Sequence, residues 1–354
     1  MELKKDSVTA LGLMSGTSLD GLDLCYAAFN RENNKNWQFE IICAETIQYD
    51  EKLEQQLRSS ISMSATELAA FNVEYGFYLG EQIQELLNKH QLSSPEIIGS
   101  HGHTVFHQPE RKFTVQIGDG RAIRQVTGTP VVYDFRMQDV LLGGNGAPLV
   151  PIGDELLFSD YQACLNLGGF SNISFIKNNQ RLAFDICPVN IVLNSLCRKL
   201  GQPFDHNGDI ARNGEVNCSV LEKLNAISFY NVPPPKSLGI EWVQQHITDL
   251  IKEFKPQEAI ATITEHAASQ IASVLNNEQI KNILITGGGA KNQFLIERIR
   301  AHSTAELILP ELELIDFKEA LIFGFMAVLR LTHQNNVLSS ATGSAHDHCT
   351  GILV

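Results

Sequence analysis

Residues Leu11–Gly21 read LGLMSGTSLDG, and residues Leu165–Asn172 read LNLGGFSN. Each stretch is a glycine-bearing turn between two apolar runs. The runs that follow the turns, Leu22–Phe29 and Ile173–Ile176, are short, partly alternating and contain aromatic residues, as is typical of β-strands. Each turn is therefore predicted to join one strand to the next. A Walker A loop would instead lead from a strand into a helix and carry Gly-Lys-Ser/Thr, and neither turn has that lysine.

The two turns also suggest phosphate binding, because both are rich in glycine and short polar residues and they lie about one domain apart. Such a pair indicates two lobes that hold the phosphates of a nucleotide from opposite sides, which points to an enzyme or motor that uses ATP. Glycine lets backbone N–H groups approach a polyphosphate, and hydroxyl groups donate to its oxygens. The candidate phosphate-binding residues are Ser15, Gly16, Thr17, Ser18, Asp20 and Gly21 in the first turn, and Gly168, Gly169 and Asn172 in the second. Asp20 is also a candidate ligand of Mg²⁺, directly or through a water molecule, although an Asp-Gly hairpin turn needs no ligand at all.

The bulk composition narrows the class of protein. With 354 residues, of which 44% are hydrophobic, the chain is long enough for two domains with full cores. Its formal charge of −13 argues against sequence-independent binding to nucleic acid or to an anionic membrane, since both require a basic surface. No stretch is apolar enough to span a membrane, and the first residues lack the apolar core of a signal peptide. The seven cysteines are scattered without a Cys-x-x-Cys motif, so a reduced, cytoplasmic protein is expected.

The order of predicted elements is the same in the two halves of the chain. In the first half, three strands precede a long helix and a fourth strand, at residues 8–14, 22–29, 39–49, 64–89 and 97–100. The helix is capped by Ser64 or Thr66. In the second half, three strands precede two helices and a buried strand, at residues 163–166, 173–177, 182–186, 191–200, 242–254 and 283–286. This β-β-β-α-β order is that of the actin-like ATPase domain and differs from the β-α-β alternation of a dinucleotide-binding fold.

We therefore predict an α/β protein with the two-lobed actin-like ATPase (ribonuclease H-like) fold, built from duplicated β-β-β-α-β-α units around an interdomain cleft. The N-terminal lobe would comprise residues 1–150, and the C-terminal lobe residues 151–315. Residues 316–354 would form a helix and a tail that cross back to the N-terminal lobe. The segment Arg136–Pro151, which is rich in glycine and proline, is the natural crossing between the lobes.

Two further motifs of the second half are candidates for the chemistry. Gly287, Gly288 and Gly289 follow the buried strand and precede a helix, so the backbone there can lie flat against a planar ring or a phosphate. Adenosine lies at this position in the actin-like architecture, and a close strand-to-helix turn is the alternative. Asp185 ends a strand, where a carboxylate that faces the cleft is well placed to take a proton from an attacking nucleophile. Capping of the helix that starts near Asn190 explains this aspartate equally well.

Two histidine clusters have spacings that could bind a metal ion. His101, His103 and His107 lie close together, but no carboxylate or cysteine completes a ligand set, so polar contacts beside a ligand are favoured over a metal ion. His346-Asp347-His348-Cys349 is denser, and it is interpreted as a solvated tail.

At this point the motifs resemble those of a known family. Met14–Asp23 is similar to the N-terminal motif of the anhydro-N-acetylmuramic acid kinases, members of the sugar kinase/Hsp70/actin superfamily. Further similar segments follow in the order of that family and span nearly the whole chain, at residues 100–104 with His107 and Pro109, 116–119, 134–136 with Asp139, 143–151, 166–173, 234–237, 287–292 and 318–321.

The resemblance implies a particular reaction. Such a kinase transfers the γ-phosphoryl group of MgATP to O6 of 1,6-anhydro-N-acetylmuramic acid while water opens the anhydro bridge at C1. The product is N-acetylmuramic acid 6-phosphate, an intermediate of peptidoglycan recycling. A homodimer is expected by similarity only.

The resemblance also implies roles for individual residues. Asp185 would activate the water, Gly16–Gly21 would hold the ATP phosphates, and Gly287–Gly289 would lie against adenosine. Thr104, Arg136 and Glu319 match positions at the sugar. Arg136 is a suitable partner for the lactyl carboxylate or a sugar oxygen, because guanidinium groups bind carboxylates with two hydrogen bonds.

The sequence departs from the family pattern next to Asp185. Residues 184–190 read FDICPVN where the family has Phe-Asp-Thr-Gly-Pro-Gly-Asn, so Cys187 and Val189 replace both glycines. If those glycines leave room beside phosphate or sugar, the two side chains are expected to narrow the site. His103 stands where the family usually has glutamine. These differences keep two alternatives open, a kinase of the same fold for another hexose or amino sugar and an ATP-binding homologue with weakened catalysis.

Overall fold

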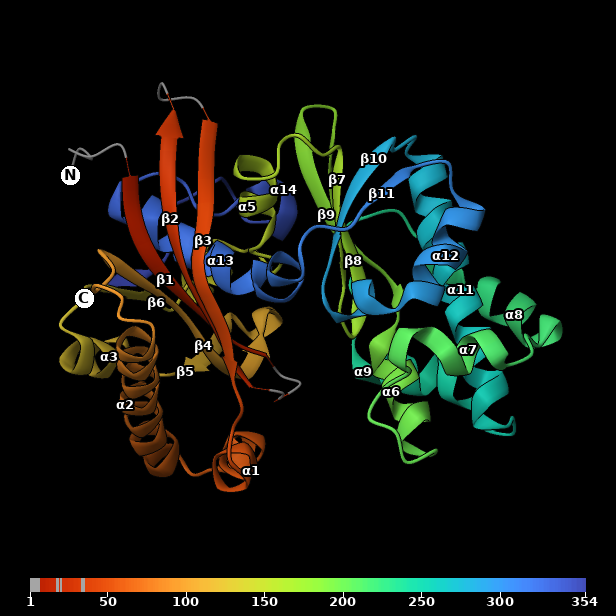
Figure 1. Ribbon diagram of the computed structural model, residues 1–354, viewed down its shortest axis with the longest axis horizontal. Coiled ribbons are helices and arrows are strands. Elements are labelled where there is room, and N and C mark those ends of the chain that lie inside the picture. The colour runs from red at the N-terminus through yellow and green to blue at the C-terminus, as the bar shows by residue number, and fades with distance from the viewer. Residues whose placement is uncertain (1–6, 17–18, 20, 33–35) are drawn as a thin grey trace. The chain divides into compact units, whose positions relative to one another are not determined.

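The computed structural model describes residues 7–16, 19, 21–32 and 36–354. The chain divides into two compact units (Figure 1). Unit 1 comprises residues 1–158 and 317–354, and unit 2 comprises residues 159–316. The segment Arg136–Pro151 lies within unit 1.

The described residues of unit 1 form a seven-stranded sheet in the order β12-β6-β4-β1-β2-β3, with β5 paired to β4. Its strands are β1 (Ser7–Ser15), β2 (Leu22–Glu32), β3 (Asn36–Ile47), β4 (Ile97–Gln108), β5 (Phe113–Ile117), β6 (Val131–Tyr133) and β12 (Ile352–Leu353). The helices are α1 (Glu51–Ser59), α2 (Ala65–Lys89), α3 (Gly120–Thr127), α4 (Met137–Leu141), α5 (Pro151–Leu156) and α14 (Ser339–Thr342), together with α13 (Leu312–Leu331), which belongs to this unit from Phe317 onward. Two 3₁₀ turns are η1 (Ser60–Ser62) and η2 (Pro109–Arg111).

The described residues of unit 2 form a five-stranded sheet in the order β11-β10-β7-β8-β9. Its strands are β7 (Ala163–Leu167), β8 (Phe170–Lys177), β9 (Gln180–Pro188), β10 (Asn282–Thr286) and β11 (Glu306–Ile308). The helices are α6 (Asn190–Arg198), α7 (Asp209–Asn213), α8 (Cys218–Asn225), α9 (Ile240–Val243), α10 (Asp249–Ile251), α11 (Pro256–Asn277) and α12 (Gln293–His302). Shorter helical segments are η3 (His206–Gly208), η4 (Ser228–Asn231), η5 (Gln244–Thr248) and η6 (Gly288–Lys291).

The two sheets have the same topology, which confirms the predicted duplication. In unit 1, β1 pairs antiparallel with β2 and parallel with β4, and β4 pairs parallel with β6. In unit 2, β7 pairs antiparallel with β8 and parallel with β10, and β10 pairs parallel with β11. Each sheet thus has its third, second, first and fourth strands in that spatial order, followed by β6 in unit 1 and by β11 in unit 2, with the second strand antiparallel to its neighbours. This is the ribonuclease H-like arrangement expected from the sequence.

Alternating residues of β1 pack against different layers of unit 1. Leu11 and Leu13 belong to a core cluster with the apolar face of α2. Gly12 faces α13 instead, and a Cβ atom added to it would lie 1.8 Å from the carbonyl oxygen of Ala320. Gly99 of β4 is equally close to α13, since its added Cβ would lie 2.1 Å from the oxygen of Phe323. Helix α13 therefore lies with its backbone directly against the two strands.

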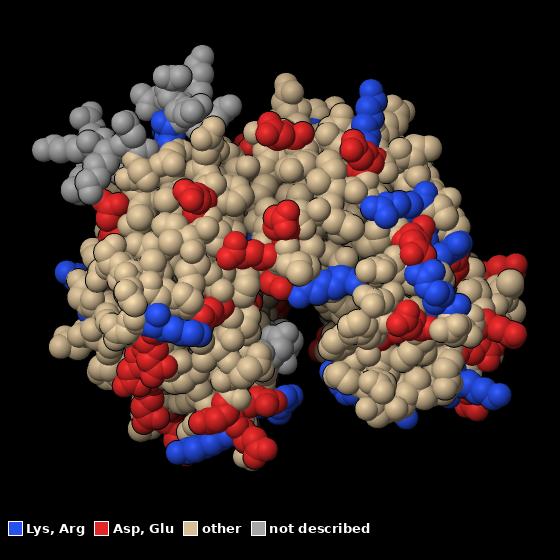
Figure 2. Space-filling view, in the orientation of Figure 1, with Lys and Arg blue, Asp and Glu red and all other residues tan. Residues whose placement is uncertain are grey.

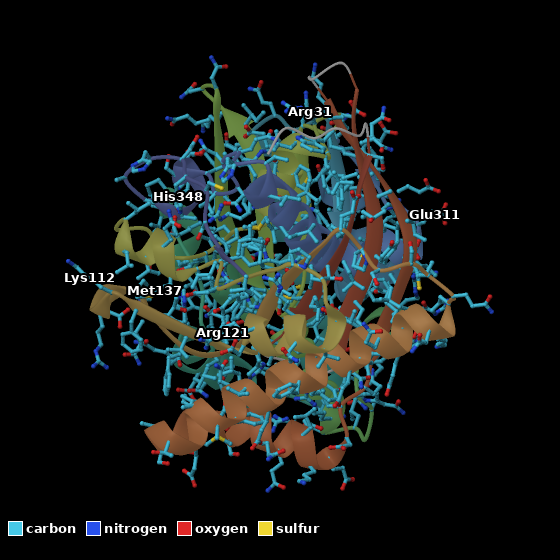
Figure 3. All side chains as sticks on the ribbon, turned by 90° about the vertical axis from the view of Figure 1, so that its left-hand side faces the viewer. Arg31, Lys112, Arg121, Met137, Glu311 and His348 are labelled. Atoms are coloured by element: carbon cyan, nitrogen blue, oxygen red, sulfur yellow. The ribbon has the colours of Figure 1, made fainter. Side chains whose placement is uncertain are left out.

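The C-terminal segment is packed onto unit 1, so the prediction of a solvated tail is wrong for His348 and Cys349, whereas His346 and Asp347 are exposed. His348 and Thr350 are 4% and 0% exposed. The Thr350 hydroxyl donates to the Phe135 oxygen at 3.0 Å, and β12 pairs with β6. The backbone pairing of β12 with β6 and the hydrogen bond of Thr350 attach the segment to the sheet. His348 is labelled in Figure 3.

Charged groups of both signs are distributed over the surface. Figure 2 shows acidic and basic side chains interspersed among uncharged ones on the visible face of each unit. In the part of the chain that the structure describes, no helix combines the length and the apolarity needed to cross a bilayer.

Candidate functional site

The first glycine-bearing turn follows β1 directly. Thr17, Ser18 and Asp20 lie outside the described residues, so their predicted contacts with phosphate and Mg²⁺ stay predictions. Within the turn, the Leu19 N–H donates to the Gly16 oxygen at 3.3 Å. Gly21 has a φ of 142°, and a Cβ there would lie 2.8 Å from the Ile47 oxygen. Glycine at position 21 is therefore required by the backbone itself, with or without a bound phosphate.

The side chain of Ser15 belongs to a buried hydrogen-bond network. Tyr49 Oη donates to Ser15 Oγ at 2.8 Å, and Ser15 Oγ lies 3.2 Å from His103 Nδ1. Burial lowers the pKa of His103 to about 4, so its ring is neutral at neutral pH. Tyr75 Oη lies 2.9 Å from Tyr49 Oη and extends the network.

Arg136 is held at the beginning of α4 by two neighbours. Its Nε donates to His101 Nε2 at 2.8 Å, and its Nη1 donates to the Gly146 oxygen at 2.6 Å. Burial lowers the pKa of Arg136 to about 10, and the nearby carboxylates of Glu319 and Asp139 oppose that shift. The guanidinium therefore stays charged at neutral pH. Met137, which follows it in α4, is labelled in Figure 3.

Thr104 and Glu319 belong to the same unit as Arg136. Glu319 lies in α13, next to the Ala320 backbone that contacts β1. Thr104 lies on β4, three residues after His101, and accepts a hydrogen bond from Gln116 Nε2 at 3.3 Å. Unit 1 thus places Arg136 within the electrostatic influence of Glu319, with Thr104 on the strand that carries the histidine partner of Arg136.

Unit 2 brings its two glycine turns to one end of its sheet. Asn166 of β7 and Thr286 of β10 are register partners, so the residues that follow each strand lie side by side. Asn190 Nδ2 donates to the Leu167 oxygen at 3.2 Å, and it would lie 3.4 Å from a Cβ at Gly289. Asn172 is in the same hairpin as Gly168 and Gly169 and pairs in register with Asp185.

The glycines of these turns fall into two classes. Gly287 has a φ of 83° and an added Cβ would lie 2.3 Å from Asn166 Oδ1, whereas a Cβ at Gly289 would lie 2.8 Å from Leu167 Cβ. Packing inside the protein therefore requires glycine at both positions. At Gly168, Gly169 and Gly288 the nearest atoms would be 3.5, 3.6 and 4.0 Å away. Nothing within the described chain requires glycine at these three positions, which leaves space beside the backbone.

Asp185 does not cap a helix. Strand β9 continues past it to Pro188, and α6 begins after Val189 without a side-chain cap. The Asp185 Oδ2 atom instead accepts a hydrogen bond from the Leu238 N–H at 2.8 Å, and the Asp185 N–H donates to the Lys236 oxygen at 3.1 Å. Burial raises the pKa of Asp185, an effect that the Leu238 N–H partly offsets. The carboxylate is thus oriented by the backbone and is a stronger base than an exposed aspartate.

Cys187 and Val189 point into the core of unit 2. Both are 0% exposed and belong to the core cluster around α6 and α11. Cys187 Sγ lies 3.2 Å from Ser171 Oγ and 3.9 Å from the Ala267 oxygen, and burial raises the pKa of its thiol to about 12. The expectation that these two side chains narrow a site is therefore wrong for the described structure, because neither lines an accessible surface.

Comparison with known proteins decides the family. The model of the family described as anhydro-N-acetylmuramic acid kinase matches residues 8–354. The chain belongs to the anhydro-N-acetylmuramic acid kinase family. The resemblance inferred from the motifs is thereby confirmed.

Individual relatives extend over the same length. The chain is 34% identical over 374 residues to the anhydro-N-acetylmuramic acid kinase of Pasteurella multocida, with 97% of this chain and 95% of that protein covered. It is 37% identical over 306 residues to the anhydro-N-acetylmuramic acid kinase of Pseudomonas putida, with 82% of each chain covered. Among solved structures, the (R)-2-hydroxyglutaryl-CoA dehydratase component A of Acidaminococcus fermentans matches at 12% identity with a TM-score of 0.47, over 92% of this chain and 99% of that one. That similarity is too low to add to the family assignment.

Several residues of this anhydro-N-acetylmuramic acid kinase family member support the candidate site without having been predicted. Asp139 is 0% exposed, and its carboxylate accepts from the Gly146 N–H at 2.7 Å and from Thr342 Oγ1 at 2.7 Å. It thereby fixes the loop whose Gly146 oxygen holds Arg136. In unit 2, Leu238 supplies the N–H that orients Asp185. The Leu238 side chain takes no part in this hydrogen bond, so the residue type at position 238 could not have predicted the contact.

Proposed function

We propose that this protein is an ATP-dependent kinase that opens 1,6-anhydro-N-acetylmuramic acid with water and phosphorylates O6, giving N-acetylmuramic acid 6-phosphate. The family match over residues 8–354 supports the substrate and the reaction. The observation that carries the chemistry is the partly buried carboxylate of Asp185, whose pKa is raised by burial and whose Oδ2 accepts from the Leu238 N–H. This combination suits a residue that takes a proton from water.

Asp185 acts as the general base in this proposal. The carboxylate accepts a proton from the water that attacks C1, and the resulting hydroxide forms the new C1–O bond. The bond between C1 and the bridging oxygen breaks, and that oxygen, O6, receives the phosphoryl group. A positioned general base contributes roughly a hundred- to ten-thousand-fold to the rate. The Leu238 N–H keeps the carboxylate in one orientation and so limits the loss of entropy on reaching the transition state.

In the same proposal, Arg136 binds the lactyl carboxylate or a sugar oxygen of the substrate. Its guanidinium remains protonated, since its pKa is about 10. His101 and the Gly146 oxygen hold it in place, which leaves part of its planar face and donor set for the lactyl carboxylate or a sugar oxygen. Glu319 and Thr104 offer an acceptor and a hydroxyl for sugar hydroxyl groups.

The nucleotide is assigned to the glycine turns. Bound MgATP supplies the γ-phosphoryl group and the metal charge that neutralises it. Gly168, Gly169 and Gly288 fit such a ligand, because each has room beside its backbone that the protein itself does not fill. Asn172, in the same hairpin, offers an amide to phosphate oxygens, and Gly287 and Gly289 shape the turn against adenosine. Gly16–Gly21 is the second phosphate-binding segment, and Asp20 is the proposed Mg²⁺ ligand. We also expect a cytoplasmic homodimer.

The direct test is to incubate the protein with MgATP and 1,6-anhydro-N-acetylmuramic acid in ¹⁸O-labelled water. The expected product is N-acetylmuramic acid 6-phosphate with one labelled oxygen at C1, detected by mass spectrometry. Asp185→Asn should lower turnover about a hundred- to ten-thousand-fold while nucleotide binding is retained. The matched control is Asp160→Asn, which changes an exposed carboxylate of the same unit and should leave turnover intact. Unlabelled product, or near-normal turnover of Asp185→Asn, would refute the role given to Asp185.

A further inference from the structure

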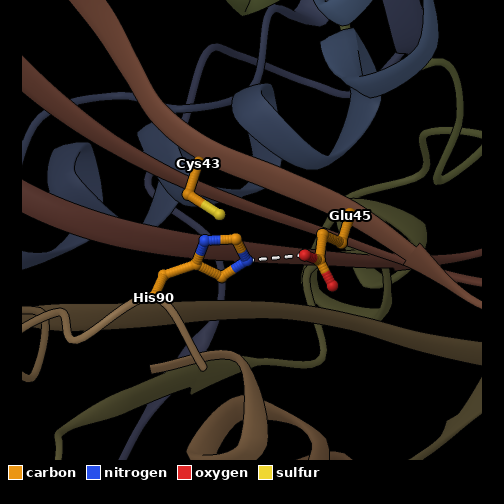
Figure 4. Close-up of side chains that lie close together, drawn as sticks. All are labelled: Cys43, Glu45 and His90. Atoms are coloured by element: carbon orange, nitrogen blue, oxygen red, sulfur yellow. Dashed lines mark hydrogen bonds and ion pairs between the residues drawn. The ribbon is translucent and has the colours of Figure 1, made fainter. Parts of the chain in front are cut away.

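A cysteine, a glutamate and a histidine that have no part in the site described above meet in unit 1. Cys43, Glu45 and His90 each offer one ligand atom, and these atoms all lie within 4.8 Å of one another. Figure 4 shows the three side chains converging, with His90 Nε2 bonded to Glu45. That bond measures 2.5 Å. Among the described residues, this is the one group of three or more such side chains that meets this distance criterion.

The fold brings the three residues together from two elements. Cys43 and Glu45 are two positions apart on β3, so their side chains lie on the same face of the strand. His90 is the C-cap residue of α2, and its N–H donates to the Leu86 oxygen at 3.1 Å. Strand β3 is at the edge of the sheet, since it pairs only with β2 in the described strand order. The cluster therefore joins an edge strand to the end of the longest helix of the described chain.

Thiolate, imidazole and carboxylate are together a ligand set for zinc and related transition metals. Zinc binds sulfur at about 2.3 Å and nitrogen or oxygen at about 2.0–2.2 Å, so tetrahedral ligand atoms lie roughly 3.3–3.8 Å apart. The observed separations of up to 4.8 Å need an approach of about 1 Å, which side-chain rotation supplies. Cys43 is 9% exposed, and the His90 side chain is 35% exposed, so the set is anchored in the core and open to solvent on one side.

We propose that Cys43, Glu45 and His90 bind a divalent transition metal ion of the zinc class, with water as the fourth ligand. On binding, the Cys43 thiol releases its proton to solvent and forms a metal–sulfur bond. The His90 ring binds through Nε2 and carries its proton on Nδ1. Glu45 Oε1 loses its hydrogen bond with His90 Nε2 and binds the metal ion instead. The ion then crosslinks β3 to α2, a role in stability that is separate from phosphoryl transfer.

Lys89 competes with the metal for Glu45. Its Nζ lies 2.7 and 2.9 Å from the two carboxylate oxygens, and this pair and His90 lower the pKa of Glu45. The Lys89 side chain is exposed and that of Glu45 is partly exposed, and ion pairs of this kind contribute little to stability. A metal ion therefore replaces the lysine at small cost, and removal of the lysine should strengthen metal binding.

The experiment is a titration of the full chain, stripped of metal under reducing conditions, with Co²⁺ and then Zn²⁺. Co²⁺ should produce a thiolate-to-cobalt charge-transfer absorption that saturates at one ion per chain, and Zn²⁺ should abolish it. Zn²⁺ should also raise the melting temperature, because the ion binds the folded state. Cys43→Ser should abolish the absorption, and His90→Gln and Glu45→Gln should each weaken binding by about tenfold or more. Lys89→Met should bind more tightly than the unaltered chain.

Controls separate this site from the other cysteines. Cys218 is exposed, so Cys218→Ser should leave the absorption and the thermal shift unchanged. Circular dichroism establishes that each variant is folded, and Glu45→Gln keeps the test valid if Cys43→Ser does not fold. The proposal would be overturned by the absence of a charge-transfer band, by a band that survives Cys43→Ser, or by weaker metal binding in Lys89→Met. Glu45, Lys89 and His90 would then form only a surface ion-pair cluster. Kinase activity of Cys43→Ser should match that of the unaltered chain, so a failure here is distinct from a failure of the proposed function.

Discussion

Single residues illustrate how the surroundings of a side chain set its chemistry. Asp139 is a buried aspartate and Asp185 a partly buried one, and they differ in their partners. Asp139 accepts hydrogen bonds from an N–H and a hydroxyl and is 0% exposed, which suits a residue that holds a loop. Asp185 accepts one backbone hydrogen bond, and burial raises its pKa. No described residue forms a hydrogen bond with the other carboxylate oxygen of Asp185, as a general base requires.

The raised pKa of Asp185 predicts the pH dependence of turnover. A general base acts only when ionised, so kcat should fall as the pH decreases through the pKa of Asp185. Because burial raises that pKa, the acid limb of the profile should lie at a higher pH than an exposed aspartate would give. A pH–rate profile of the unaltered chain and of Asp185→Asn checks this expectation. The residual rate of the variant should lack that acid limb, and a shared limb would assign it to another group.

Cys187 offers a second test at this scale. Because its side chain is 0% exposed in the core, Cys187→Gly should remove packing and not widen a sugar site. We expect a loss of about 1–3 kcal/mol in the free energy of unfolding, measured with urea, and an unchanged KM for the sugar. Cys218→Ala, at an exposed position, should change stability by less than about 0.5 kcal/mol. A lower KM in Cys187→Gly would restore the interpretation that this residue narrows the site.

At the scale of elements, the first four strands of each unit could be predicted from the sequence, whereas β5, β6, β11, β12 and the long helix α11 were not predicted. Alternating apolar residues between glycine-bearing turns located the hairpins, and Ser64 and Glu67 form the capping box that starts α2. No helix was predicted over α11, and α13 was predicted only as a helix somewhere within residues 316–354. In α13, consecutive residues from Ala320 to Phe323 and from Phe325 to Leu329 are buried, so the helix is apolar all round and has no polar stripe.

Part of the candidate site also escaped prediction for a physical reason. The Leu238 N–H and the Gly146 oxygen are backbone groups, and their positions depend on the path of the chain and not on residue type. The burial of Cys187 and Val189 follows from the register of β9 and from the turn into α6, which a motif comparison does not describe. Sequence motifs therefore located the candidate residues but not the direction in which their side chains point.

The turns of unit 2 predict opposite outcomes for two neighbouring glycines. Gly288→Ala should leave the melting temperature unchanged, because the nearest atom would be 4.0 Å from the new methyl group. The methyl group would occupy the proposed nucleotide space and should weaken ATP binding by about tenfold, which corresponds to roughly 1.4 kcal/mol. Gly287→Ala should instead destabilise the fold, since the φ of Gly287 is 83° and the new methyl group would clash with the Asn166 side chain. Calorimetric ATP titration and thermal unfolding of both variants test the contrast, and equal ATP affinity in Gly288→Ala would place the nucleotide elsewhere.

At the scale of the whole molecule, the last residues of the chain complete a unit that begins with the first residues. Asn336 Nδ2 donates to the Met326 and Thr350 oxygens at 3.1 and 3.0 Å, and the Thr350 hydroxyl binds the Phe135 oxygen. His348 Nε2 lies 3.6 Å from Asp139 Oδ1. The C-terminal segment is therefore part of the structure that holds the Arg136 loop.

Removal of residues 344–354 should consequently destabilise unit 1 by more than about 4 kcal/mol, because it deletes a strand and several buried hydrogen bonds. Limited proteolysis should then cleave unit 1 first, and ATP-dependent turnover should be lost. Ile352→Thr keeps the segment and changes a side chain that is 47% exposed, so it should cost no more than about 0.5 kcal/mol. A truncated chain with normal protease resistance would contradict this account.

The contact between α13 and the sheet has a consequence for adaptation of the enzyme. Main-chain atoms at Ala320 contact β1 directly at Gly12. No side chains separate α13 from the strand at this point, so α13 cannot shift or rotate there without a backbone clash. Glu319, one residue away, therefore inherits the rigidity of the central strands. In the proposed sugar site, a change of specificity through this carboxylate would require a change in the length or polarity of the side chain, because the close backbone contact prevents the helix beneath it from moving.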